Sequence, residues 1–161
     1  MALPKNLSKH FKGVLFGGNW SDSNYKDQLA DVDWKMATSK VAGLNTIAQL
    51  VYHATYYLPH IANVLEGGPL QAKDKYSWET PDIKSEADWQ ALLDGVWADA
   101  ERLIAVTAKL PEEQMWADFS DPKYGHCFSN LNGIIEHLHY HLGQIVLLKK
   151  LHGSKGYSEL L

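Results

Sequence analysis

The chain has 161 residues, with 15 Lys and Arg against 19 Asp and Glu, 45 % hydrophobic residues and 21 % charged ones. These values fit one ordinary globular domain spanning residues 1–161 and exclude a disordered or collagen-like chain. The net charge of −4 argues against nucleic-acid binding, and the single cysteine excludes an intrachain disulfide and a multi-cysteine zinc site.

The N-terminal segment has helical periodicity over residues 6–16 and ends at Gly17-Gly18, where glycine favours a helix stop. Three lysines and a histidine interrupt the apolar residues of the stretch from Met1 to Phe16, whereas a secretory signal needs an uninterrupted apolar run. No stretch of the chain reaches the roughly 18 apolar residues of a membrane span. We therefore expect no membrane segment and, with a lone thiol, a cytoplasmic protein. Residues 25–40 are interpreted as a connection with some local structure.

The second strong segment covers residues 46–65, and Asn45 is its predicted N-cap. Its apolar residues recur at spacings of three and four, as one face of an amphipathic helix requires. They are Ile47, Leu50, Val51, Ala54, Leu58, Ile61 and Leu65. Pro59 lies within this stripe and predicts a kink, because proline removes a backbone donor and crowds the preceding turn.

Two further helices complete the predicted architecture. The third begins after the capping residue Ser85 and stops at Pro111, and the fourth covers residues 130–151. Residues 71–81 and 111–127 are predicted to be loops, and no alternating strand pattern competes with the helices. Four amphipathic helices predict an all-α fold, a four-helix bundle whose long inner connections favour a crossover topology.

The eight histidines are the most informative residues, because imidazole is the commonest metal ligand. His137 and His141 are four residues apart on the fourth helix, so both lie on one face. His53 lies at the edge of the apolar stripe of the second helix and supplies a third candidate ligand. Three protein ligands with an open position are typical of a catalytic metal site. His139 points to the opposite flank and is excluded from the set.

Other interpretations stay open on the residues alone. A helical histidine pair is often only hydrogen-bonded at the edge of a core. His60 follows His53 by two helical turns, so it is either a cavity-lining catalytic base or a boundary residue. Cys127 is interpreted as a small buried residue rather than a reactive thiol. His10, His126 and His152 have no partner on a helix face, and the chain contains no phosphate-binding glycine loop and no Gly-x-Ser-x-Gly elbow.

The fourth helix carries a recognisable motif, with the sequence IIEHLHYHLGQI over residues 134–145. It resembles the closing helix of the DinB-like (YfiT-like) metalloenzyme family, in which a His-x3-His pair is followed by Gly-Gln and an apolar residue. The stretch from Leu50 to His53 resembles the Leu-x-x-His element of that family's second helix. The resemblance implies a four-helix bundle with an up-down-down-up arrangement, a homodimer, and three histidines on a divalent metal ion, nickel or zinc.

The resemblance also implies a range of activities, which includes thiol-dependent S-transferases, relatives of maleylpyruvate isomerase, and hydrolases. We predict a divalent-metal-dependent enzyme with His53, His137 and His141 as ligands. Thiol-dependent transfer with a low-molecular-weight thiol is favoured, because the sequence offers no strong general base beyond His60. The alternatives are a metal-dependent hydrolase and a non-catalytic metal-binding stress-response dimer.

Overall fold

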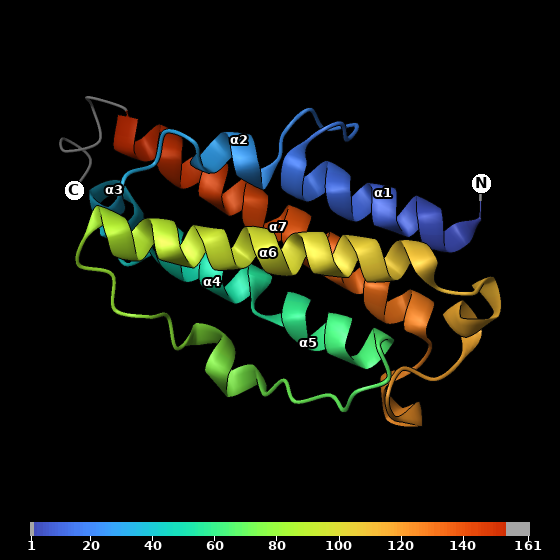
Figure 1. Ribbon diagram of the computed structural model, residues 1–161. Coiled ribbons are helices and arrows are strands. Elements are labelled where there is room, and N and C mark those ends of the chain that lie inside the picture. Colours follow the sequence, from blue (N-terminus) through green and yellow to red (C-terminus); the bar gives the residue numbers. More distant parts are fainter. Residues whose placement is uncertain (1, 154–161) are drawn as a thin grey trace.

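The computed structural model describes residues 2–153, and within them it contains helices and no strand. Four long helical segments lie lengthwise beside one another (Figure 1). They are α1 (Leu3–Phe16), the pair α4 (Ile47–Thr55) and α5 (Tyr57–Leu65), α6 (Glu86–Lys109) and α7 (Cys127–Gly153). The shorter helices are α2 (Tyr25–Leu29), α3 (Trp34–Thr38), η1 (Asp74–Trp78), η2 (Glu112–Trp116) and η3 (Pro122–Tyr124). The prediction of an all-α chain is confirmed for this part of the sequence.

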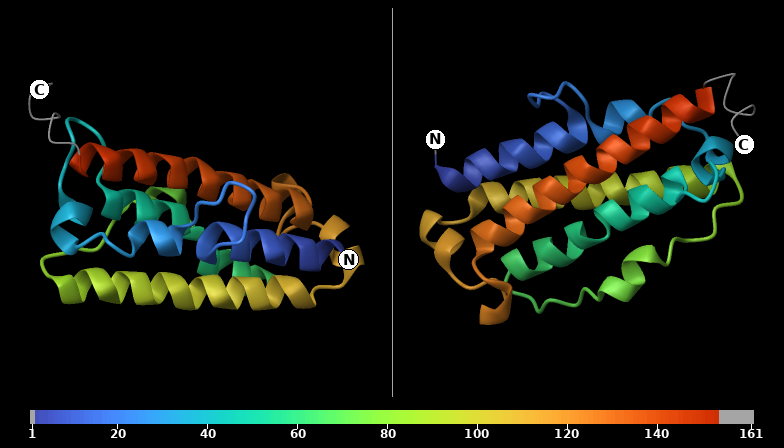
Figure 2. Two further views of the ribbon diagram at one scale, coloured as in Figure 1. Left: turned by 90° about the horizontal axis from the view of Figure 1, so that it is seen from above. Right: turned by 180° about the vertical axis from the view of Figure 1, so that it is seen from behind.

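The four long segments run in two opposite directions. In Figure 1, α1 and α7 run one way, whereas α4–α5 and α6 run the other way. Because α5 and α6 are parallel, residues 66–85 must return along the length of these helices, and both Figure 1 and the rear view in Figure 2 show this segment on the outside. In the interior, α6 packs against α1 and α5, and α7 packs against α4 and α1.

The break in the second long segment lies upstream of the proline that causes it. The helix is interrupted at Tyr56, between α4 and α5. Pro59 has no N–H to donate to the carbonyl of Thr55, and its ring crowds that carbonyl, so the regular hydrogen bonding fails there. The predicted kink is present, and it divides the segment into two helices.

The predicted helix boundaries differ from the observed ones at three ends. Thr46, and not Asn45, caps α4: its Oγ1 accepts from the Gln49 N–H at 3.2 Å, and Gln49 Oε1 accepts from the Thr46 N–H at 2.9 Å. Helix α1 begins at Leu3 because Pro4 is tolerated in a first turn, where its missing N–H has no intrahelical partner to lose. Helix α7 begins three residues before the predicted start, at Cys127.

Two buried hydrogen bonds tie the connection between α1 and α4 to the core. The fully buried indole of Trp89 donates to the carbonyl of Val32 at 2.7 Å, and the buried hydroxyl of Tyr25 donates to the carbonyl of Leu138 at 2.9 Å. In each case the polar atom of a buried aromatic side chain, the indole nitrogen or the phenol oxygen, has a hydrogen-bond partner. In the described part of the chain, no helix is long and apolar enough to cross a membrane.

Candidate metal centre

Three histidines from two packed helices converge on one point. His53 comes from α4, and His137 and His141 come from α7. The Nε2 atom of His137 lies 3.2 Å from that of His53 and 3.0 Å from that of His141. One ligand atom from each of the three lies within 4.8 Å of the others. Nitrogens bound to one ion at 2.0–2.1 Å are themselves roughly 2.9–3.4 Å apart for angles of 90–109°, so the two spacings from His137 fit a shared metal.

The tautomer of His53 is fixed by a hydroxyl from η1. Ser77 Oγ donates its single hydrogen to the carbonyl of Asp74 at 2.7 Å, and it lies 2.9 Å from His53 Nδ1. Because that hydroxyl hydrogen is already used, Nδ1–H of His53 must be the donor to Ser77 Oγ. The Nε2 atom of His53 therefore carries a lone pair directed at the other two rings, as a metal ligand requires.

Gln144, one turn further along α7, fixes the tautomer of His141. Its carbonyl oxygen Oε1 lies 2.7 Å from His141 Nδ1 and accepts a hydrogen bond from it. This places the proton on Nδ1 and the lone pair on Nε2. His137 differs, because its Nδ1 is buried and has no hydrogen-bond partner within residues 2–153.

The arrangement of lone pairs suits a cation better than a shared proton. With Nε2 of both His53 and His141 unprotonated, a proton on His137 Nε2 could be donated to only one of them at a time. One close pair of nitrogens would then be left without a shared hydrogen. A cation between the three rings interacts favourably with all three lone pairs at once, so the donor set fits a metal ion.

The surroundings hold these histidines in the neutral form that binds metal. Burial, together with the neighbouring His141 and His53, lowers the pKa of His137 to about 4. Burial also lowers the pKa of His53 and, although the hydrogen bond to Gln144 opposes the effect, the pKa of His141. Neutral imidazole coordinates metals without first releasing a proton.

Aromatic rings complete the walls of the centre. The indole of Trp78, at the end of η1, stacks on His53 with ring centroids 3.7 Å apart and planes 12° apart. Tyr140 contacts His141 edge-on, with centroids 4.9 Å apart. Helix η1 thus supplies both the hydroxyl that orients His53 and the ring that covers it.

A cavity of about 630 Å³ opens beside the centre, and His53 and His137 form part of its wall. Tyr57 also lines it, and its hydroxyl donates to Asp74 Oδ1 at 2.6 Å. Burial and this hydrogen bond raise the pKa of Tyr57 to about 12, so its hydroxyl keeps its proton at neutral pH. Apolar side chains form much of the remaining wall, and no Lys or Arg is among the lining residues.

The other histidines lie away from the centre. The Nδ1–H of His139 donates to the carbonyl of Ile135 at 2.9 Å, and His139 is not a member of the cluster, as predicted from its position on the helix. His60 packs against Tyr56 and lines a different cavity, so the structure does not bring it to the three clustered histidines. Cys127 is buried, and burial raises the pKa of its thiol to about 11, which disfavours the reactive thiolate.

The residues around the three histidines were not predicted from the sequence. Gln144 could have been found, because it follows His141 by three residues and so lies on the same face of α7. Ser77 and Trp78 left no such signal, since they come from a predicted loop far from His53 in the sequence. Asp74 and Tyr57 meet only because that loop folds back onto α5.

No protein-family model, curated protein or solved structure that was compared with the chain matches it.

Proposed function

We propose that the chain is a metal-dependent enzyme in which His53, His137 and His141 hold a divalent ion, nickel or zinc. The proposal is carried by one observation, the convergence of three Nε2 atoms with two of the tautomers fixed by Ser77 and Gln144. A bound divalent ion would supply Lewis acidity, which lowers the pKa of a thiol or water that it binds. Membership of the DinB-like family is part of this proposal, supported by the motif on α7 and by the directions of the four long segments (Figure 1).

A catalytic role is favoured over a purely structural one by the number of ligands and by the cavity. Structural zinc sites usually have four protein ligands, whereas the cluster offers three. The cavity of about 630 Å³ reaches the edges of His53 and His137, so a small molecule bound there lies next to the ion. A non-catalytic metal-binding protein would gain nothing from such an opening.

The proposed chemistry is thiol-dependent transfer. The sulfur of a low-molecular-weight thiol forms a bond to an electrophilic carbon, the leaving group departs with the bonding electrons, and the thiol proton is transferred to it. The chain's own contribution is to orient the reactants in the apolar cavity, where the Tyr57 hydroxyl, which donates its hydrogen to Asp74, offers its oxygen as an acceptor. Away from the ion, the cavity wall carries the Asp74 carboxylate and no Lys or Arg is among its lining residues, so the part of a reactant that lies there should not be anionic.

Metal-dependent hydrolysis is the second candidate, and one observation favours it. Asp74 places a carboxylate in the cavity wall beside the histidines, where it can accept a proton from water as the water oxygen attacks an acyl carbon. The proton then passes to the leaving group. The sequence alone offered no such base, because Asp74 lies in a segment predicted to be a loop.

The decisive experiment combines elemental analysis with turnover. The purified chain is loaded with nickel or zinc and assayed with mercaptoethanol plus chlorodinitrobenzene, and separately with nitrophenyl acetate. We expect product formation that depends on both metal and thiol, is lost in His137→Ala and is retained in His139→Ala. Thiol-independent ester cleavage with the same dependence on His137 would favour the hydrolase. Metal binding without turnover of either pair would favour the non-catalytic alternative.

The proposed oligomeric state is a homodimer, as the family resemblance implies. Static light scattering measures the mass in solution directly. A mass of one chain at micromolar concentration would contradict this part of the proposal without affecting the metal centre.

A further inference from the structure

A second cavity, of about 600 Å³, lies between α4–α5 and α6. Residues 81–83 of the connection before α6 form part of its wall. None of its lining residues belongs to the cavity beside the three ligands. The two cavities are therefore distinct, although both border α4–α5, and the function proposed above does not use the second.

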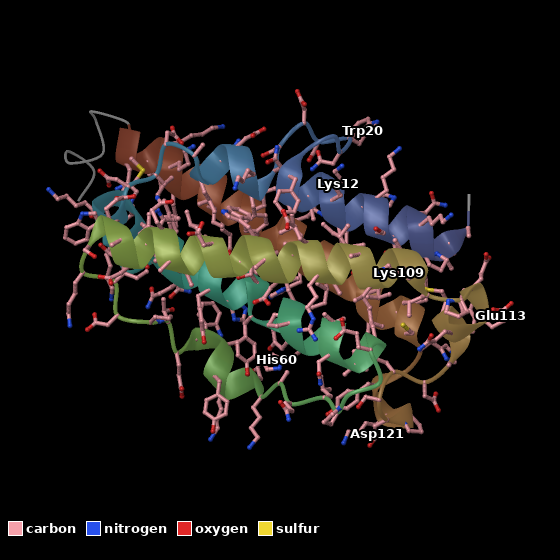
Figure 3. All side chains as sticks on the ribbon, in the orientation of Figure 1. Lys12, Trp20, His60, Lys109, Glu113 and Asp121 are labelled. Carbon is pink, nitrogen blue, oxygen red and sulfur yellow. The ribbon has the colours of Figure 1, made fainter. Side chains whose placement is uncertain are left out.

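One wall of the second cavity is a column of aromatic rings. Tyr52, Tyr56 and His60 follow one another at intervals of four residues, so their side chains share a face of the helix. The ring centroids of Tyr52 and Tyr56 are 6.1 Å apart, and those of Tyr56 and His60 are 4.9 Å apart. His60 is labelled in Figure 3. The faces of tyrosine rings are electron-rich and attract cations.

The ionisable groups opposite this column are acidic. Asp82, Asp88 and Asp99 line the cavity, and none of its lining residues is Lys or Arg. Two of the three are already engaged: Asp82 pairs with Lys84, and Asp88 accepts hydrogen bonds from the Ser85 hydroxyl and from the Lys84 N–H.

Asp99 is the acid that remains available. Within residues 2–153 its half-buried carboxylate has no hydrogen bond or ion pair, and burial raises its pKa. The nearest cation, Arg102, is held by Glu66 through two hydrogen bonds. The hydroxyl of Tyr52 and both ring nitrogens of His60 are also without hydrogen-bond partners in the described part of the chain. Unused polar groups that converge on a largely apolar cavity are typical of a small-molecule site.

We propose that this second cavity binds a small organic amine in its cationic form, with Asp99 as the counter-ion and the rings of Tyr52 and Tyr56 against the charged group. The apolar body of the amine lies on the floor formed by side chains such as Leu92 and Val96 of α6. An anion is disfavoured by the three carboxylates, and a neutral molecule leaves Asp99 without a partner.

The experiment uses three probes of similar size that differ in charge: phenethylamine, phenethyl alcohol and hydrocinnamate. Binding to the full chain is followed by calorimetry and by amide chemical shifts along α4–α5 and α6. We expect phenethylamine to bind with a millimolar or tighter Kd, and the other two to bind at least about tenfold more weakly. Equal binding of the amine and the alcohol, or no shifts at these helices with any probe, would overturn the proposal.

Asp99→Asn tests the counter-ion, because it keeps the size of the side chain and removes the charge. It should weaken amine binding by about tenfold or more, since one close ion pair in a partly buried site is lost. Asp94→Asn is the matched control, because Asp94 is an exposed acid of α6 outside the cavity. Similar amine affinity in Asp99→Asn and the unaltered chain would refute the role of Asp99. Metal content, measured alongside, should not change in either variant.

Discussion

The most direct test of the metal centre removes the Ser77 hydroxyl, which contacts His53 and is not itself a proposed ligand. Ser77→Ala deletes the hydroxyl that accepts from His53 Nδ1–H at 2.9 Å and donates to the carbonyl of Asp74 at 2.7 Å. Ser77 is fully buried, so water cannot readily replace the lost partner. His53 would keep its position on α4 but lose the contact that fixes its tautomer and ring orientation.

The expected loss of metal affinity is about 10- to 100-fold, the usual effect of removing such a partner, which corresponds to roughly 1.4–2.7 kcal/mol of binding free energy. The carbonyl and N–H left unpaired should also lower the unfolding free energy by about 1–3 kcal/mol. Competition with a coloured zinc or nickel chelator measures the first quantity, and urea unfolding of the metal-free protein measures the second.

Ser129→Ala is the control, because Ser129 lines the same cavity but is exposed and makes no hydrogen bond in the described part of the chain. It should leave both quantities nearly unchanged. If Ser77→Ala binds metal as tightly as the unaltered chain while losing stability, the hydroxyl is only structural. The tautomer argument for His53 would then be wrong.

Further predictions concern the ligands, the pH response and the core. His137→Ala should lose most of the bound metal in elemental analysis, whereas His139→Ala should retain it; the reverse result would overturn the assignment. The pKa of His137 is about 4 in the folded metal-free chain and near 6.5 when unfolded, so the unfolded state binds more protons between these values. The stability of the metal-free chain should therefore be unaffected by His137 above pH 6.5 and fall as the pH drops towards 4, and a urea midpoint that rises on acidification would contradict this. Trp89→Ala should lower the unfolding free energy by about 3–5 kcal/mol, because it empties a fully buried site and removes the hydrogen bond to Val32. A much smaller loss would mean that the core refills the site.

The sequence predicted the helical segments and the three converging histidines because both depend on local spacing. Apolar residues at intervals of three and four identify the buried face of each helix, and the same geometry puts His137 and His141 side by side. The edge position of His53 on its helix was enough to suggest a partner for that pair. The exclusion of His139 followed from the same rotation per residue, and the structure agrees with it.

Residues that depend on how the connections fold could not be predicted in this way. Ser77 reaches His53 from a segment with no helical periodicity, and no spacing rule relates two residues that are 24 positions apart. The N-cap of α4 also could not be chosen from the sequence alone. Asn45 and Thr46 are both good capping residues, and only the reciprocal hydrogen bonds with Gln49 decide between them.

The placement of His60 shows why rotation along a helix does not by itself identify a site. In an ideal helix, a residue seven positions after His53 lies only about 20° away around the axis, which favours a shared face. Yet His53 and Tyr57 line the cavity of the metal centre, whereas Tyr56 and His60 line the cavity against α6. Because the helix is interrupted at Tyr56, the ideal rotation does not carry over from His53 to His60, and the two side chains border different cavities. The helix break at Tyr56 lies between His53 and His60 in the sequence. The packing of α6 and of residues 66–85 around this segment decides which cavity each side chain lines.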